Sequence, residues 1–240
     1  MSNNSKLVVV VGKEEEEEDE QQEVNVQYEQ DGPEAQVIAQ HLPYFPFKGI
    51  SRFYDIGGFL AEPQVFQKIV HIFSNRYKTS SIDVVAGLDA RGFILGPPIA
   101  LVLKKPFIMI RKPGKMPNTI SSQSYLTEYG EREGLTIQRD KVKPGDRVLI
   151  VDDLVATGGT LASAIQLIQA LGGIVAECCC VVELKHFAQS RRELFQKRNI
   201  DHVSIWGLVS EDILTVEGQL PDDYVDDGDE DHSLRASVYR

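Results

Sequence analysis

The stretch Val148-Leu-Ile-Val-Asp152-Asp153-Leu154-Val-Ala156-Thr157-Gly158-Gly159-Thr160 carries the most specific pattern in this chain. Its first four residues are apolar, which predicts a buried strand that ends at Val151. The loop that follows has two threonines and two glycines directly before a segment with helical spacing. Such a loop can direct several backbone N–H groups and a helix N-terminus at one anion, and glycine lets the ligand approach the backbone closely. Phosphate is the expected occupant.

Two adjacent carboxylates, Asp152 and Asp153, separate the predicted strand from this loop. Carboxylates at the end of a strand can accept hydrogen bonds from sugar hydroxyls that lie about one loop-width from the phosphate. The combination therefore predicts a ribose 5-phosphate site. Two other phosphate-binding motifs, Gly-x-x-x-x-Gly-Lys-Ser/Thr and Gly-x-Gly-x-x-Gly, are not found in the chain, which argues against a P-loop kinase or a dinucleotide-binding protein.

Outward from this stretch, short apolar runs alternate with segments of helical length. This alternation is typical of strand–helix–strand units and predicts an α/β fold with a mainly parallel central sheet. The periodicity predicts strands over 82–88, 106–111, 147–151, 174–184 and 203–208, and helices over 62–77, 93–103, 161–171 and 187–198. Ligands of such sheets bind outside the carboxyl ends of the strands.

Charge is unevenly distributed along the 240 residues. Residues 1–35 hold 11 acidic and 2 basic side chains, residues 221–240 hold 7 and 2, and the remaining 185 residues are slightly basic. We expect an acidic disordered extension over 1–35, one domain over 36–220 and an acidic tail over 221–240. A basic body suits small anions, whereas acidic ends would repel nucleic acid. No apolar run reaches the ~20 residues of a membrane span, so we expect neither a nucleic-acid nor a membrane partner.

The three cysteines, Cys178, Cys179 and Cys180, are consecutive. Neighbouring residues on a strand point to opposite faces, so these thiols cannot form a disulfide framework or a metal cage and are expected to fill the core. A reducing, cytoplasmic compartment is the corresponding expectation.

The segment 112–134 has Pro, Gly, Asn and Ser without periodicity, and loops of this length are usually functional. We interpret it as a mobile flap.

Taken together, these residues resemble a known family. Val148 to Thr160 is similar to the signature with which type I phosphoribosyltransferases bind phosphoribosyl diphosphate (PRPP), and it is closer to the adenine members than to the hypoxanthine-guanine or orotate members. Gly87-Leu-Asp89-Ala-Arg91-Gly-Phe93, Arg111-Lys112-Pro-Gly-Lys115 and Glu128-Tyr129-Gly130 agree with this resemblance. It implies a parallel-sheet core, a small hood over the base, a mobile flap and a homodimer. It also implies the Mg²⁺-dependent reaction of adenine with PRPP, which gives AMP and pyrophosphate.

The resemblance assigns roles residue by residue. The residues that it implies for PRPP and AMP binding are Asp152, Asp153, Ala156, Thr157, Gly158, Gly159 and Thr160. Those that it implies for pyrophosphate binding are Arg91, Arg111, Lys112 and Lys115, with Arg111 as the candidate that could reach a neighbouring subunit's site. Glu128 is the implied catalytic carboxylate that handles a proton of the base, and Tyr125 and Tyr129 are flap residues that pack over the closed site. Mg²⁺ is expected to bind mainly through the substrate, with no direct protein ligand.

Adenine itself is expected to contact Arg52, Phe53 and Leu154, in the hood segment 49–56 and after the acid pair. Many relatives have Phe-Arg-Asp where this chain has Phe53-Tyr54-Asp55, so Tyr54 stands in place of the family's arginine. Two alternatives remain at this point. One is a phosphoribosyltransferase for another 6-aminopurine, and the other is a PRPP-sensing regulator that has the fold without catalysis. Glu128 within the flap favours the enzyme.

Overall fold

A computed structural model describes residues 28–47, 49–121 and 134–220 of the chain. Its helices and strands are, in chain order, α1 (Pro33–Ala39), β1 (Tyr44–Phe47), β2 (Ile50–Tyr54), α2 (Gly57–Leu60), α3 (Pro63–Tyr77), β3 (Val84–Leu88), α4 (Gly92–Val102), β4 (Phe107–Arg111), β5 (Thr119–Ser121), β6 (Thr136–Gln138), β7 (Arg147–Val155), α5 (Gly159–Ala170), β8 (Ile174–Glu183), η1 (Lys185–Phe187), α6 (Ala188–Lys197), β9 (Ile205–Ser210) and η2 (Glu211–Ile213). None of the helices in these ranges combines the length and hydrophobicity that a membrane crossing requires.

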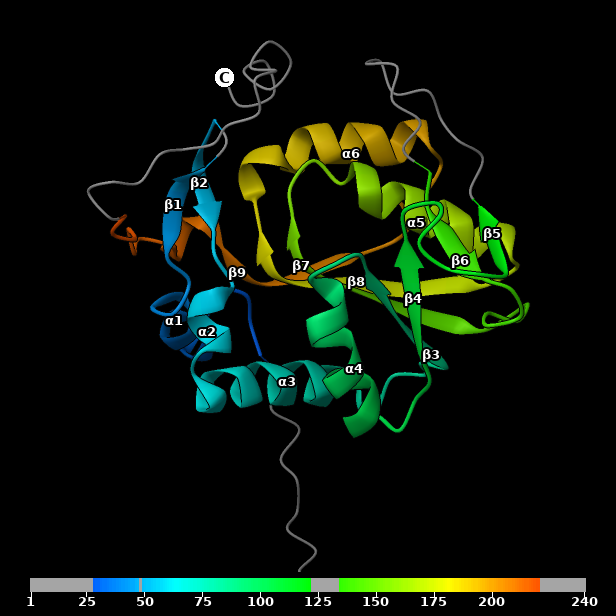
Figure 1. Cartoon of the computed structure of the whole chain (residues 1–240), viewed down its shortest axis with the longest axis horizontal. Helices are drawn as coiled ribbons and strands as arrows, with labels where there is room; N and C mark the ends of the chain where they lie inside the picture. The colour runs from blue at the N-terminus through cyan, green and yellow to red at the C-terminus, as the bar shows by residue number, and fades with distance from the viewer. Residues whose placement is uncertain (1–27, 48, 122–133, 221–240) are drawn as a thin grey trace, which may run out of the picture.

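A seven-stranded sheet in the order β5-β6-β4-β3-β7-β8-β9 forms the centre of the molecule. Its strands β4, β3, β7, β8 and β9 are parallel, β6 runs antiparallel to β4, and the edge strand β5 runs antiparallel to β6. Helices α3 and α4 cover one face and α5 and α6 cover the other (Figure 1). The predicted α/β class with a mainly parallel sheet is therefore confirmed.

The core consists of two apolar layers, one on each face of this sheet. Alternate residues of β7 divide between them: Leu149 packs with α3 and α4, and Ile150 packs with α5. The cysteines follow the same rule, since Cys179 faces the first layer whereas Cys178 and Cys180 face the second. All three thiols are free and buried, as predicted. Desolvation by burial raises the pKa of each thiol, so they are inert core residues.

Strand β7 is longer than the sequence predicted, and this difference shapes the site. Instead of ending at Val151, it continues to Val155 because the long strand β8 pairs with it throughout, from Arg147↔Ile174 to Val155↔Glu183. On its other side, pairing with β3 stops at Gly87↔Val151. Residues 152–155 thus extend past β3 with a strand neighbour on one side only, and on the other side the start of α4 lies close to Val151 and Asp152. The acid pair lies within this overhang.

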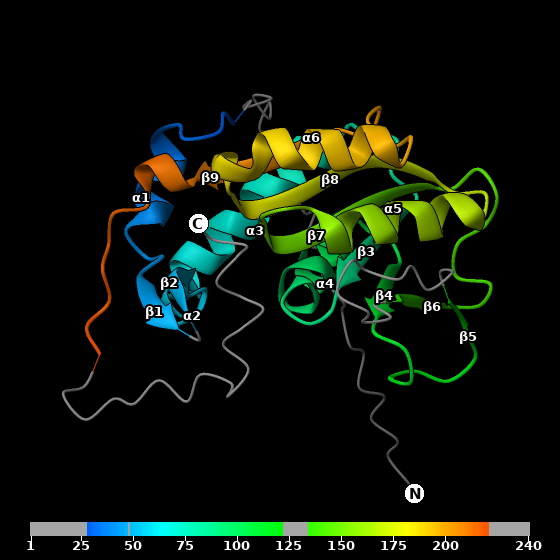
Figure 2. The same cartoon turned by 90° about the horizontal axis from the view of Figure 1, so that it is seen from above.

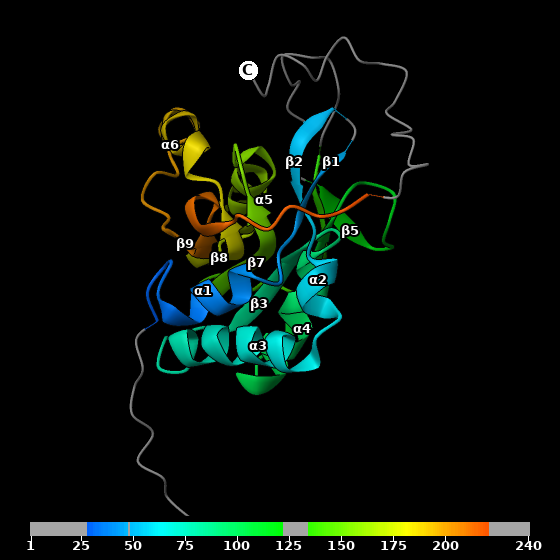
Figure 3. The ribbon, with the colours of Figure 1, turned by 90° about the vertical axis from the view of Figure 1, so that its left-hand side faces the viewer.

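The small antiparallel sheet of β1 and β2 lies at one end of the central sheet, as the expected hood (Figures 2 and 3). Helix α1 precedes it and packs under β9. Disorder was expected up to residue 35, but residues 28–35 are ordered where the structure describes them. Ala35 is fully buried, and Asp31 accepts hydrogen bonds from the backbone N–H and hydroxyl of Ser210, both at 2.7 Å. The folded part of the chain thus begins earlier than the charge pattern indicated, because Asp31 is hydrogen-bonded to Ser210 and Ala35 is buried.

Two other segments differ from their predicted structure. Helix α4 begins at Gly92, one residue before the predicted start, and contains Pro97 and Pro98 in its interior. The predicted flap 112–134 contains the short strand β5, which pairs antiparallel with β6 directly after the segment. Residues 122–133 and 221–240 are outside the described residues, so the flap's mobility and the acidic tail stay predictions.

Candidate active site

The predicted phosphate loop, residues 156–160, connects β7 to α5. Gly158 precedes the helix with φ +81°, a conformation that favours glycine, and no side chain caps the first turn of α5. A Cβ added to Gly159 would meet no atom within 4 Å, so this residue faces open space. Thr157 and Thr160 are exposed. The uncapped N–H groups of a 12-residue helix therefore face a free volume next to two hydroxyls, which is the geometry of an anion site.

The acids Asp152 and Asp153 lie directly before this loop, in the part of β7 that extends past β3. Asp153 is buried, Asp152 is partly exposed, and the Asp152 carboxylate accepts a hydrogen bond from the Asp153 N–H at 3.0 Å. Burial, followed by the nearby charge of Asp153, raises the pKa of Asp152 well above its ordinary value. Burial also raises the pKa of Asp153, and the charge of Arg91 partly offsets this effect. Hydroxyl donors that bound these carboxylates would therefore stabilise their ionised form.

Arg91, at the N-terminus of α4, joins three parts of the predicted site. Its Nη1 lies 2.9 Å from the Asp153 carboxylate, and its guanidinium carbon lies 5.3 Å from the centre of the Phe53 ring. The sequence separates these residues by about 40 to 60 positions, and the fold brings the hood, the start of α4 and the acid pair together. This contact places a predicted base-binding ring next to a predicted pyrophosphate-binding cation.

The other predicted pyrophosphate-binding residues are Arg111, the last residue of β4, and two lysines that follow it. Arg111 donates from Nε to Asp89 at 3.0 Å and from Nη1 to the Lys115 carbonyl at 3.4 Å, and its guanidinium carbon lies 5.6 Å from the Phe93 ring centre. Lys112 and Lys115 are exposed. Arg111 is thus anchored to the loop between β3 and α4 of its own chain. Its use by a neighbouring subunit stays a prediction.

The base-binding residues predicted in the hood lie on two faces of β2. Arg52 is exposed, with its guanidinium carbon 4.8 Å from the Tyr44 ring centre, whereas Phe53 faces Arg91. Tyr54, at the position of the family's arginine, is buried and packs edge-on against Tyr44 with ring centres 6.2 Å apart. Burial raises the pKa of the Tyr54 hydroxyl, so it stays neutral. Leu154, the third predicted residue, packs onto the core next to the acid pair.

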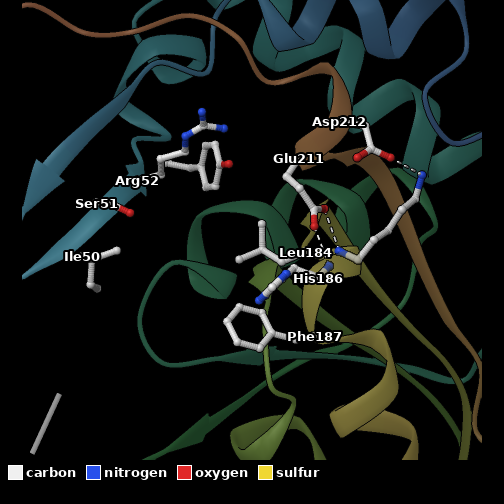
Figure 4. Close-up of a pocket in the computed structure, with 10 residues that line it drawn as sticks. Ile50, Ser51, Arg52, Leu184, His186, Phe187, Glu211 and Asp212 are labelled. Carbon is white, nitrogen blue, oxygen red and sulfur yellow. Dashed lines mark hydrogen bonds and ion pairs between the residues drawn. The ribbon is translucent and has the colours of Figure 1, made fainter. Parts of the chain in front are cut away.

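A cavity of about 630 Å³ separates the hood from the carboxyl ends of β8 and β9. Figure 4 shows Ile50, Ser51 and Arg52 of β2 on one side and Leu184, His186, Phe187 and Glu211 on the other. Arg52 is therefore the predicted base-binding residue that borders this space, since Phe53 and Leu154 are not among the residues that line it.

Three predicted residues, Glu128, Tyr125 and Tyr129, are outside the described residues. Conversely, the structure reveals site residues that sequence reasoning missed. Asp89 holds Arg111, and the buried Arg191, paired with the partly buried Glu183, donates to a carbonyl of the predicted phosphate loop. Asp89 is within a recognised motif and could have been found there. Arg191 is more than 30 positions from the loop, in a helix that is rich in charged residues, and no local pattern distinguishes it.

Comparisons with known proteins agree with this geometry. Residues 56–212 match the family model described as "Phosphoribosyl transferase domain". Adenine phosphoribosyltransferase 2 of Arabidopsis thaliana is 49% identical over 146 residues, which cover 61% of this chain and 75% of that protein.

Two solved structures are also similar. The adenine phosphoribosyltransferase of Leishmania tarentolae superposes with a TM-score of 0.73 at 31% identity, over 80% of this chain and 94% of that one. The enzyme of Trypanosoma brucei, solved with AMP, pyrophosphate and ribose-5-phosphate, gives a TM-score of 0.72 at 29% identity, over 82% and 88%. With its phosphate loop, acid pair and hood arranged as described above, this chain belongs to the adenine phosphoribosyltransferase family of type I phosphoribosyltransferases.

Proposed function

We infer that the protein transfers the phosphoribosyl group of PRPP to adenine and releases AMP and pyrophosphate. One observation carries this conclusion: two adjacent carboxylates at the end of β7 directly precede a helix N-terminus that no side chain caps, and a guanidinium lies 2.9 Å from the second carboxylate. This arrangement provides acceptors for a diol, donors for a phosphate and a cation for a second anionic group. The relatives named adenine phosphoribosyltransferase, and the related structure that holds AMP and pyrophosphate, support the same reaction.

We propose that the phosphate loop binds the 5′-phosphate and that the acid pair binds the ribose hydroxyls. The N–H groups of residues 157–160 would donate to the phosphate, together with the hydroxyls of Thr157 and Thr160. Asp152 and Asp153 would accept from the 2′ and 3′ hydroxyls, and hydrogen bonds to charged groups of this kind contribute ~1.5–3 kcal/mol each. Together these contacts would hold the C1′ carbon in place for displacement.

The leaving pyrophosphate would be bound by Arg91, Arg111, Lys112 and Lys115. The bond between C1′ and the pyrophosphate oxygen breaks while the bond to the base nitrogen forms, so positive charge develops on the ribose ring and negative charge on the leaving group. Cations at the mouth of β3 stabilise that negative charge. Breaking of the pair between Arg91 and Asp153 would free both groups for their respective parts of PRPP.

We propose that Mg²⁺ binds with PRPP and neutralises charge on its diphosphate. Within ranges 28–47, 49–121 and 134–220, no three His, Cys, Asp or Glu side chains gather in a way that could hold a metal ion. The acids near the site fit a cation held chiefly by substrate oxygens and water, which is the usual preference of Mg²⁺. Asp152 is the partly exposed carboxylate that could contact the ion's water shell.

Adenine would enter between Phe53 and Leu154, with main-chain groups near Arg52 at its edge. Phe53 offers a ring face for stacking, and the adjacent Arg91 would link base and pyrophosphate positions. Glu128 would handle the proton on the imidazole edge of the base, and Tyr125 and Tyr129 would cover the closed site. At the position next to Phe53, a neutral, buried Tyr54 replaces the family's charged arginine. Because this replacement changes the residues around the proposed base pocket, another 6-aminopurine is the alternative substrate.

A homodimer is the proposed assembly. Helix α4 exposes Ile94, Leu101 and Val102, with 38%, 78% and 60% of their surfaces accessible, and the neighbouring strand β4 exposes Met109. Ile94 and Leu101 are seven residues apart and share a helix face. An exposed apolar patch of this kind is typical of a protein interface.

We also propose a cytoplasmic location, because three free, buried cysteines suit a reducing compartment.

The experiment that tests the function is incubation of the full chain with PRPP, Mg²⁺ and each purine base in turn, with pyrophosphate release as the readout. We expect turnover with adenine that exceeds turnover with hypoxanthine and guanine by at least ~100-fold, since unpaired polar groups in a base pocket are costly. Turnover with a different 6-aminopurine would identify the alternative substrate. PRPP binding without turnover on any base would contradict the enzyme and indicate a sensor.

A further inference from the structure

A buried arginine from α6 contacts the back of the phosphate loop. Arg191 is 5% exposed, and its Nη1 donates to the carbonyl of Ala156 at 2.7 Å and to that of Leu184 at 3.3 Å. Its Nη2 pairs with the carboxylate of Glu183, at the end of β8. One guanidinium therefore connects the phosphate loop to the end of the neighbouring strand.

The aliphatic part of the same side chain supports the glycine of the loop. A Cβ on Gly158 would lie 2.9 Å from Cγ of Arg191 and 3.2 Å from Cε1 of Phe195, so the loop backbone rests directly on these two α6 residues. A Cβ added to Gly159, by contrast, would meet no atom within 4 Å, so the loop faces open space at this residue. Arg191 thus packs against the loop at Gly158 and leaves the space at Gly159 open.

The geometry of the peptide unit means that this hydrogen bond also fixes the direction of the Thr157 N–H. In a trans peptide unit the C=O of one residue and the N–H of the next point in opposite directions. When Arg191 holds the Ala156 carbonyl toward α6, the Thr157 N–H must point away from α6, to the open side of the loop. Glu183 in turn orients the guanidinium, and its second oxygen accepts a hydrogen bond from Gln30 Nε2 at 3.0 Å.

We propose that Arg191, oriented by Glu183, is a positioning residue that presets the phosphate loop with its N–H groups directed at the 5′-phosphate of PRPP. The proposal rests on the function inferred above and extends it to residues that do not touch substrate. A loop held in its binding conformation before the ligand arrives loses less conformational entropy on binding. Loss of the guanidinium should therefore weaken binding of the phosphoribosyl group more than it weakens binding of the base.

The test compares Arg191→Lys with Arg192→Lys in the full chain. Both variants keep the net charge, but Arg192, the next residue of α6, is exposed and serves as the control. We measure KM for PRPP, KM for adenine, kcat, the melting temperature and calorimetric affinity for ribose 5-phosphate. For Arg191→Lys we expect KM for PRPP and Kd for ribose 5-phosphate to rise about tenfold, which corresponds to about 1.4 kcal/mol, with KM for adenine within twofold of wild type.

A purely structural role would lower the melting temperature and the active fraction while both KM values stay unchanged, and that outcome would overturn the proposal. If Arg191→Lys does not fold, Glu183→Gln takes its place, because it keeps the side-chain volume and should raise the Kd for ribose 5-phosphate about threefold; an unchanged Kd refutes the proposal. The two inferences fail differently. A wild-type chain without turnover contradicts the function, whereas an active wild type with a fully competent Arg191→Lys variant contradicts only the positioning role.

Discussion

The substitution Asp152→Asn should lower the affinity for PRPP without lowering the stability of the free protein. The asparagine keeps the shape of the side chain, and its carbonyl oxygen can still accept the hydrogen bond that Asp153 N–H now donates at 3.0 Å. The change removes one negative charge from a partly exposed position next to a buried carboxylate. Binding and stability should therefore respond in opposite directions.

The expected loss of affinity follows from the hydrogen bonds to the ribose. A hydrogen bond to a charged acceptor contributes ~1.5–3 kcal/mol, against ~0.5–1.5 kcal/mol for a neutral one. The difference of about 1–2 kcal/mol corresponds to PRPP binding that is about 5- to 30-fold weaker. Calorimetry with PRPP and Mg²⁺ measures this directly, and Asp201→Asn, which removes one charge from an exposed turn, is the matched control.

The stability of the free protein should move the other way. Burial and the charge of Asp153 raise the pKa of Asp152 well above 3.8, so the folded chain holds this proton more tightly than the unfolded chain does. Between the ordinary pKa and the raised one, the free energy of unfolding of the wild type therefore falls as pH rises. In Asp152→Asn this loss is absent, and we expect a melting temperature at pH 7 that equals or exceeds that of wild type. PRPP affinity within twofold of wild type, or a variant that is less stable at neutral pH, would refute the reasoning.

Three further predictions concern other parts of the chain. Glu128→Gln should lower kcat by about 10²-fold or more, the usual contribution of general acid–base help, with PRPP affinity unchanged; near-normal kcat in a quenched-flow assay would remove this residue from the mechanism. Deletion of residues 1–27 should preserve kcat and melting temperature, whereas a deletion that also removes Asp31, which binds Ser210, should lower the melting temperature; equal melting temperatures of the two deletions would contradict this. Leu101→Glu should convert the proposed dimer to monomer in analytical ultracentrifugation, because Leu101 is 78% exposed on the apolar face of α4; an unchanged sedimentation coefficient would place the interface elsewhere.

Local sequence patterns were sufficient to predict the fold class and several other features of this protein. The alternation of apolar runs and helical segments predicted the α/β class, and the consecutive cysteines were correctly predicted to fill the core. The stretch from Val148 to Thr160 located the phosphate loop, because a strand, an acid pair and a glycine-rich helix start are adjacent in sequence as well as in space. Features of this kind are formed by residues that are adjacent in the chain, so they can be recognised from the sequence.

Other features depended on partners that are distant in sequence. The extension of β7 to Val155 follows from pairing with β8, whose length could not be related to β7 without the sheet. The ordering of residues 28–35 follows from the hydrogen bonds between Asp31 and Ser210, 179 positions away. In both cases the hydrogen-bonding partners are far apart in the sequence and become neighbours only in the folded chain.

The sequence by itself therefore determined the fold class, and it was sufficient to predict where a phosphate loop lies and which residues surround it. Only the tertiary structure decided that Arg91 reaches Asp153 and Phe53 at once, and that Arg191 and Glu183 hold the loop from behind. The physical reason is the range of the forces involved. Hydrophobic periodicity and backbone propensity act over a few residues, whereas ion pairs and buried hydrogen bonds join whichever groups the packed sheet and helices bring within about 3 Å.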